Sequence, residues 1–216
     1  MKQFIVIGLG RFGSSIAKTL YNLGYDVLGI DNNEEIVQNI ASSITHSVQA
    51  DATDENTLKA LGVRNFDVAI VSIGDDIQAS ILVTLILKEM GIKYVVGKAQ
   101  NELHGKVLYK IGADRVIFPE RDMGIRVAHN LVSSNILDYI ELSPDFSIVE
   151  VNAIPEWINK TLRQLNMRTK YGLNVMAIKR NNEVMISPHA DDMILENDVL
   201  VVVGQKQDIE KLEKIL

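Results

Sequence analysis

A glycine-rich loop that directly follows an apolar segment is the feature that most constrains the fold of this chain. Residues 4–7 (FIVI) form an uninterrupted apolar run, which predicts a buried parallel strand. Residues 8–13 (GLGRFG) follow at once, and apolar side chains at helical spacing fill residues 14–23. A GxGxxG loop between a strand and a helix is typical of nucleotide-binding α/β folds, because the helix N-terminus offers free N–H groups to phosphates.

Each position of this loop has an expected role. Gly8 allows the tight turn, Gly10 lets a phosphate approach the backbone, and Gly13 permits close packing of helix on sheet. Arg11 and Phe12 are the variable positions and belong to the predicted binding site. A guanidinium at Arg11 suits a terminal phosphate by bidentate pairing and serves no purpose beside a nicotinamide ribose, so it favours ATP or ADP over NAD.

Strand-like and helix-like segments alternate through the first two thirds of the chain. Further strands are predicted at 26–31, around 48, at 68–71, 94–97 and 115–118. Helices are predicted near 36–40 and at 57–61, 77–90 and 103–111. Six strands separated by helices predict an α/β fold with a Rossmann-like, doubly wound, mostly parallel sheet.

The pattern changes after Pro119. Residues 123–140 are predicted to form one long crossover helix, followed by strands at 148–151, 175–178 and 199–203 and a terminal helix at 209–216. The expected domains are therefore a nucleotide-binding domain at 1–138, which includes the crossover helix, and a small α+β lobe at 139–216. A lobe of that size is marginal alone and would gain stability by pairing with a copy of itself.

Two acidic segments lie where the edges of a bound nucleotide should fall. Asp31 closes the second strand, 18 residues after Gly13, and can accept hydrogen bonds from both ribose hydroxyls, with Asn32 beside it. Such a carboxylate would repel a 2′-phosphate, which argues against NADP. The alternative is that Asp31 caps the next helix, a role that Asn32 or Asn33 could also fill.

The second acidic segment follows the third strand. Asp51 can accept a hydrogen bond from an adenine amino group, while the backbone of Ala52, next to Thr53, approaches the ring. The alternative is that Thr53 or Asp54 caps the helix that starts near Glu55. Both interpretations can hold together.

Composition excludes several classes of function. The 22 basic and 28 acidic residues give a net charge of −6, which argues against nucleic-acid binding. The absence of cysteine excludes disulfides and thiolate sites, and the four histidines have no ligand spacing. A start without a signal peptide and an apolar stretch of only residues 77–87 predict a soluble cytoplasmic protein. No catalytic motif is present, so we expect no enzyme; an NAD(H)-binding redox sensor or NAD-dependent oxidoreductase is the alternative.

Together, residues 8–13 (GLGRFG), Asp31, residues 50–54 (ADATD) and residues 118–120 (FPE) resemble the RCK (regulator of potassium conductance) family. The similarity points to its KtrA/TrkA-type cytoplasmic subunits and covers the whole chain, with a TrkA-N/RCK-N domain and a TrkA-C/RCK-C lobe. It implies a gating subunit that binds ATP or ADP, forms homodimers and assembles into a homo-octameric ring. The implied partner is an integral-membrane, KtrB-like potassium-translocating subunit at the inner face of the cell membrane.

The resemblance also implies roles for single residues. Arg11 would sense the γ-phosphate of ATP, and Ile73, Gly74 and Lys98 would add nucleotide contacts. Glu120, paired with its symmetry mate, would hold Mg²⁺, Ca²⁺ or Na⁺ at the dimer interface. The alternative for Glu120 is an exposed cap of the crossover helix.

A second ligand, cyclic di-AMP, is implied for the C-terminal lobe. The pattern is an Arg, five residues, then Asn and two aliphatic residues, and it occurs here as Arg168 and then Asn174, Val175 and Met176. Arg168 would face a phosphate, Asn174 an adenine edge or phosphate, and Pro188 would add apolar packing. The alternative is a surface arginine beside an ordinary strand.

Overall fold

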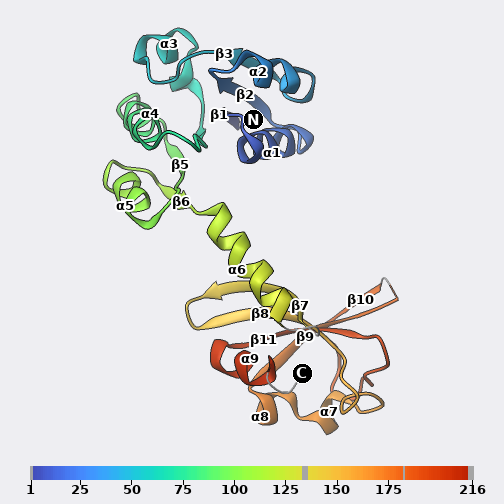
Figure 1. Ribbon diagram of the computed structural model, residues 1–216. Helices are drawn as coiled ribbons and strands as arrows, with labels where there is room; N and C mark the ends of the chain where they lie inside the picture. The colour runs from blue at the N-terminus through green and yellow to red at the C-terminus, as the bar shows by residue number, and fades with distance from the viewer. Residues whose placement is uncertain (1, 133–135, 182, 214–216) are drawn as a thin grey trace. The chain divides into compact units, whose positions relative to one another are not determined.

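The computed structural model describes residues 2–132, 136–181 and 183–213 and divides the chain into two compact units, Met1–Glu120 and Arg121–Leu216 (Figure 1). The first unit is an α/β domain and the second is a smaller, mainly antiparallel β unit. The expected fold class is therefore confirmed. The predicted boundary between residues 138 and 139 stays a prediction; the division by compactness places it after Glu120.

The first unit contains a six-stranded parallel sheet in the order β3-β2-β1-β4-β5-β6. Its strands are β1 (Gln3–Ile7), β2 (Asp26–Asp31), β3 (His46–Gln49), β4 (Val68–Val71), β5 (Tyr94–Lys98) and β6 (Arg115–Ile117). The strand order reverses between β1 and β4, and ligands of such sheets bind at the carboxyl ends of the strands beside that point. The loop that leaves β1 is the glycine loop.

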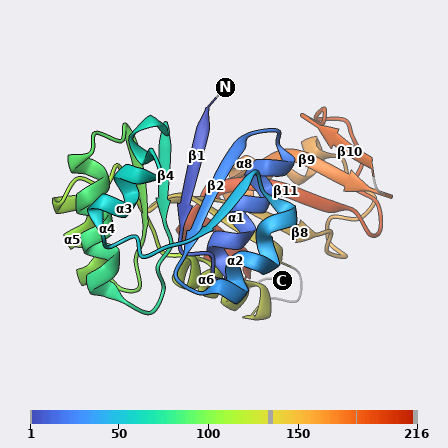
Figure 2. The ribbon, with the colours of Figure 1, turned by 90° about the horizontal axis from the view of Figure 1, so that it is seen from above.

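Helices cover both faces of this sheet (Figure 2). They are α1 (Arg11–Asn22), α2 (Glu34–Ile40), α3 (Glu55–Ala60), α4 (Ile77–Glu89) and α5 (Glu102–Lys110), with 3₁₀ turns at Ala41–Ser43 and Val63–Asn65. Alternate residues of β1 point to opposite faces: Val6 packs in a core cluster with α1 and α2, whereas Ile5 and Ile7 pack with α3 and α4. Because both faces are buried, the strands read as continuous apolar runs.

The predicted helix over 123–140 is wrong in its second half. Helix α6 (Pro119–Val132) is followed by strand β7 (Ile136–Ser143), and residues 133–135 lie outside the described part. The apolar spacing of α6 happens to continue into β7, but the backbone of β7 pairs with β8 (Phe146–Asn152). Arg126 of α6 also donates two hydrogen bonds to the carboxylate of Asp138, at 2.6 and 2.5 Å. Tertiary pairing overrides the helical pattern here.

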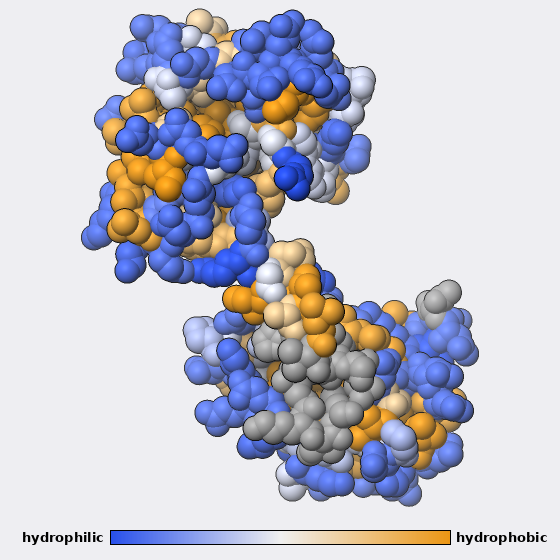
Figure 3. Space-filling view, in the orientation of Figure 1, coloured by the Kyte–Doolittle hydropathy of each residue, from blue (hydrophilic) through white to orange (hydrophobic). Residues whose placement is uncertain are grey.

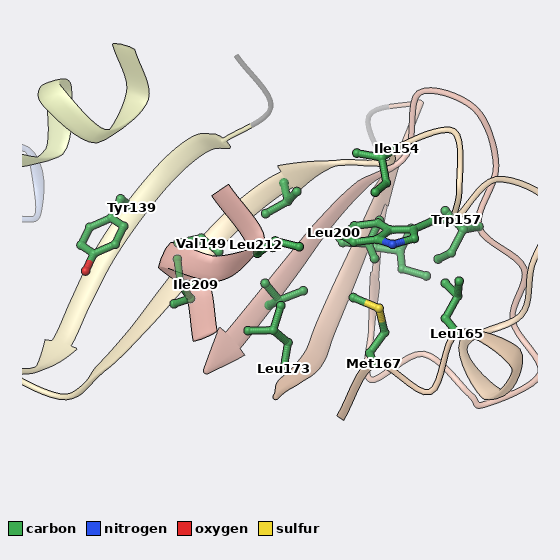
Figure 4. Close-up of a cluster of buried hydrophobic side chains, with 14 residues drawn as sticks. Tyr139, Val149, Ile154, Trp157, Leu165, Met167, Leu173, Leu200, Ile209 and Leu212 are labelled. Atoms are coloured by element: carbon green, nitrogen blue, oxygen red, sulfur yellow. The ribbon is translucent and has the colours of Figure 1, made fainter. Parts of the chain in front are cut away.

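The second unit is built on a five-stranded antiparallel sheet in the order β10-β9-β11-β8-β7. Its other elements are α7 (Leu162–Leu165), α8 (Met167–Tyr171), β9 (Leu173–Arg180), β10 (Glu183–Ile186), β11 (Val199–Gln205) and α9 (Lys206–Glu213). Its core contains the fully buried Trp157, which lies near Ile154 and Leu165 (Figure 4). The buried carboxylate of Asp198 accepts two hydrogen bonds from Arg180, both at 2.7 Å.

Candidate functional site

The glycine loop depends on the absence of side chains at its three glycines. Gly8 has a φ of +88°, and a Cβ there would lie 2.9 Å from the backbone carbon of Ser72. A Cβ on Gly13 would overlap the carbonyl oxygen of Gly8 and the hydroxyl of Ser72. A Cβ on Gly10 would meet nothing within 4 Å, so the one open glycine faces free space. The loop therefore packs tightly against β4 and leaves room for a ligand at Gly10.

Helix α1 begins at this open position without a side-chain cap. Gly10 is its N-cap, no side chain accepts from the first N–H groups, and no acidic residue stands in the first turn. Arg11 is exposed and Phe12 half-buried in that turn. Free N–H groups, the positive end of the helix dipole and a guanidinium make this end of α1 suited to a phosphate.

Asp31 is tied to the glycine loop. One carboxylate oxygen accepts from the N–H of Leu9 at 2.7 Å, and the other accepts from the N–H of Asn33 at 2.9 Å. Asn33 is the residue that caps α2, so the alternative in which Asp31 does so is excluded. The carbonyl of the neighbouring Asn32 accepts from the side chain of Gln49 at 3.2 Å. Asp31 retains unused acceptor positions beside the loop, which suits ribose hydroxyls.

The segment after β3 lies next to Asp31, because the N–H of Ala50 donates to the carbonyl of Asp31 at 3.0 Å. Oδ1 of Asp51 accepts from the hydroxyl of Thr53 at 2.7 Å and from its N–H at 2.9 Å. These two hydrogen bonds lower the pKa of Asp51. Asp54 caps α3, and Ala52 is buried. Asp54 is thus the capping residue, and the predicted contact of Asp51 with an adenine stays a prediction.

Lys98, at the end of β5, lies close to the other residues predicted to contact the nucleotide on the β4 side of β1. Its ammonium bonds Oε1 of Glu120 at 2.6 Å and lies 5.9 Å from the ring centroid of Phe12. A Cβ on Gly74 would be 3.8 Å from the same ammonium, and the adjacent Ile73 is half-buried. The hydrogen bond from Lys98 holds the pKa of Glu120 below its usual value. The structure thus brings Phe12, Gly74, Lys98 and Glu120 to one end of α1.

The fit of a cation at Glu120 can be judged from its surroundings. The side chain is 70% exposed, and one of its oxygens is held by Lys98. Across the described ranges, no group of three or more His, Asp or Glu side chains could hold a metal ion. Glu120 offers one free carboxylate oxygen, which fits a shared site completed by a second copy; this assignment stays a prediction.

Two positioning residues escaped the sequence analysis. The buried hydroxyl of Ser72 donates to the carbonyls of Ile7 and Gly8 and so fixes the glycine loop from β4. The side chain of Gln100 donates to the carbonyl of Gly74 and orients the loop after β4. A small hydroxyl residue directly after the fourth apolar strand was the available signal for Ser72.

A separate open groove of about 290 Å³ lies in the second unit. It brings together three of the residues predicted for cyclic di-AMP, and its lining is Leu162, Arg163, Asn166, Met167, Arg168, Leu173, Asn174 and Val175. Met176 and Pro188 are outside that lining, although the N–H of Ser187 donates to the carbonyl of Met176 at 2.8 Å. Arg163, which the sequence analysis missed, pairs with Asp191 at 2.8 Å and adds a second cationic group.

Known proteins resemble the chain in both units. Residues 4–119 match the TrkA-N domain and residues 146–216 match the TrkA-C domain. The Ktr system potassium uptake protein C of Bacillus subtilis (strain 168) is 53% identical over 213 residues, which cover 99% of this chain and 96% of that protein. This chain belongs to the TrkA-N/TrkA-C family of potassium-uptake proteins. The resemblance to the KtrA/TrkA-type subunits is thereby confirmed.

Other comparisons agree with this family. The Ktr system potassium uptake protein A of the same organism is 52% identical, over 98% of this chain and 96% of that protein. The crystal structure of the GsuK RCK domain has a TM-score of 0.69 at 18% identity, and covers 99% of this chain and 47% of that one, which shows the fold. Within the described residues of this TrkA-N/TrkA-C protein, no helix is long and apolar enough to span a bilayer.

Proposed function

We propose that this chain is the regulatory subunit of a Ktr-type potassium-uptake system, and that its TrkA-N domain binds ATP or ADP. The observation that carries the proposal is the uncapped start of α1 at Gly10, with Asp31 and Asp51 at the adjoining strand ends. The phosphates bind the N–H groups of α1, Asp31 accepts from the ribose, and Asp51 accepts from the adenine amino group. The two potassium-uptake relatives support the transport role.

Arg11 decides between nucleotides in this proposal. Only ATP presents a γ-phosphate to the exposed guanidinium at the start of α1, so ATP and ADP stabilise different states of the protein. A structure of GsuK bound to ADP, 28% identical with a TM-score of 0.51 over 60% of this chain, supports an adenine nucleotide ligand. The alternative is an NAD(H)-binding redox sensor or NAD-dependent oxidoreductase that uses the same loop.

The second unit supplies a second ligand site. Its groove presents Arg163, Arg168 and Asn174, and two guanidinium groups with an amide suit a ligand that carries two phosphates and two adenines. We assign cyclic di-AMP to this groove. Met176 and Pro188 would complete the site at its margin.

The partners are a second copy and a membrane protein. Helix α6 carries four exposed apolar side chains: Met123, Ile125, Val127 and Leu131. Figure 3 shows apolar surface over this helix. A surface of this kind suits a homodimer, from which an octameric ring forms beneath an integral-membrane, potassium-translocating subunit at the cytoplasmic face. A cation, Mg²⁺, Ca²⁺ or Na⁺, would bind where two copies of Glu120 meet. No residue is assigned a catalytic role, and the protein works by binding.

The decisive experiment is thermal stabilisation of the purified chain by ATP, ADP, NADH and cyclic di-AMP, with and without Mg²⁺. A ligand of the native state raises the midpoint by mass action. We expect shifts with ATP, ADP and cyclic di-AMP. A shift with NADH alone, or hydride exchange from NADH, would establish the alternative function.

The matched variant is Arg11→Ala. Because the side chain is exposed, its removal should leave the unliganded midpoint unchanged and reduce the preference for ATP over ADP about tenfold. Lys18→Ala, an exposed cation further along α1, is the control. Equal loss of ATP and ADP affinity in Arg11→Ala would reject the sensing role.

A further inference from the structure

Lys98 is the buried cation of the first unit's site. Only 11% of its side chain is exposed, and its ammonium reaches three separate segments of the chain. It bonds Glu120 at 2.6 Å, faces the ring of Phe12 at 5.9 Å, and lies beside Gly74 after β4. Phe12 stands in the first turn of α1, where the phosphates of a nucleotide are proposed to bind.

The two members of the Lys98–Glu120 pair differ in their access to water. The carboxylate side chain of Glu120 is 70% exposed, whereas the side chain of Lys98 is 11% exposed. If the pair opens, Glu120 is rehydrated at little cost, but a buried ammonium needs another anion nearby. The partner that leaves is therefore Glu120, and Phe12 places the first turn of α1, where the phosphates are proposed to bind, near the ammonium.

We propose that Lys98 exchanges Glu120 for the phosphate oxygens of a bound nucleotide, so that occupancy of the site is transmitted to the first turn of α6. The inference rests on the proposed nucleotide-binding function. Helix α6 begins at Pro119, so Glu120 belongs to its first turn, and the rest of the helix, from Arg121 on, is part of the second unit. Nucleotide binding thus breaks an ion pair between the end of β5 and this helix.

The test measures ADP and ATP affinity by calorimetry in a double-mutant cycle on the full chain. Glu120→Gln removes the competitor and should tighten binding about fivefold, because no ion pair has to be broken. Lys98→Met should weaken binding about tenfold or more. Adding Glu120→Gln to Lys98→Met should then change the affinity by less than about twofold.

The cycle separates exchange from simple repulsion. If Glu120 only repels the phosphates, Glu120→Gln will tighten binding equally with and without Lys98, and the exchange is refuted. Adenosine, which has no phosphate, should bind the parent and Glu120→Gln alike. Hydrogen exchange over α6 should rise on ADP binding in the parent and stay constant in Glu120→Gln.

A matched control is Lys88→Met, which removes the pair with Asp114 at 2.9 Å in the same unit and should change ADP affinity by less than about twofold. Circular dichroism checks that each variant is folded. If the parent binds neither ADP nor ATP, the proposed function fails. If it binds them and Glu120→Gln does not tighten binding, only the exchange fails.

Discussion

The two candidate sites of this chain are built from different parts of the polypeptide. In the first unit the glycine loop, where phosphates are proposed to bind, is made by the backbone: Gly8, Gly10 and Gly13 contribute by having no side chain. In the second unit the groove is made by side chains, with the exposed Arg163, Arg168 and Asn174 supplying its polar groups.

This difference determines how each site can change. A substitution at Gly8 or Gly13 would force the loop backbone to move, because an added Cβ would clash there, so binding and folding are affected together. A substitution of one of the exposed polar residues of the second groove, Arg163, Arg168 or Asn174, removes a contact from the surface and leaves the core that contains Trp157 intact. The first site should therefore be coupled to stability and the second should not.

The largest expected effect is that of Gly13→Ala. Its Cβ would overlap the carbonyl of Gly8 and the hydroxyl of Ser72, so the loop must shift, at a cost of about 3 kcal/mol in the free energy of unfolding. ADP binding should be lost as well. Denaturant unfolding followed by circular dichroism, together with calorimetry, measures both.

Gly10→Ala is the matched control for this prediction. Gly10 has a φ of −59° and free space around its Cβ position, so stability should change by less than about 0.5 kcal/mol. The new methyl group would still occupy ligand space and weaken ADP binding. Comparable destabilisation by both substitutions would contradict a site built on the tight packing of Gly13.

Substitution of the buried Asp198 should lower the stability of the second unit. Burial alone raises the pKa of this carboxyl, but hydrogen bonds from Arg180 and from the N–H of Leu195 outweigh it, so the net pKa is lowered. Asp198→Asn should lower the free energy of unfolding by about 2–4 kcal/mol at pH 7, because it removes the carboxylate of the pair and leaves the charge of Arg180 uncompensated. Unfolding is measured by the fluorescence of Trp157, the one tryptophan of the chain.

The pH dependence of Asp198 has a definite sign. Because its folded pKa lies below the unfolded value of about 3.9, its stabilisation is complete above that value and is lost as the pH falls through the folded pKa. Asp198→Asn should therefore flatten the stability profile in the acid range, below about pH 5. A variant that keeps the parent's acid sensitivity would exclude this carboxyl as its source.

The smallest effect on folding is expected for Arg168→Ala. The side chain is exposed in the groove, so the unfolding midpoint should not change, while cyclic di-AMP affinity should fall about tenfold. Lys160→Ala, an exposed cation outside the groove lining, is the control for a change in net charge. A loss of stability in Arg168→Ala would show that the two regions are more alike than their construction suggests.

The first unit was predictable from the sequence because its constraints are local. The short apolar runs predicted as strands are strands, and the glycine loop lies between β1 and α1 as its spacing predicts. The second unit was less predictable: residues 136–140 continue the helical pattern of α6, yet β8 pairs with them as a strand. The sequence analysis also missed the edge strand β10, whose apolar residues Val184, Met185 and Ile186 are exposed in the structure.

The sequence by itself determined the parallel α/β class, the glycine loop and the carboxylates at the strand ends, because buried strands and tight turns impose residue types at fixed spacing. Only the tertiary structure decided which side chains cap the helices, support the glycine loop and pair with one another. It assigned the cap of α2 to Asn33 rather than Asp31, placed Ser72 beneath the glycine loop, and joined Lys98 to Glu120. Such contacts join residues distant in sequence, and their partners depend on how strands and helices pack, which no local pattern records.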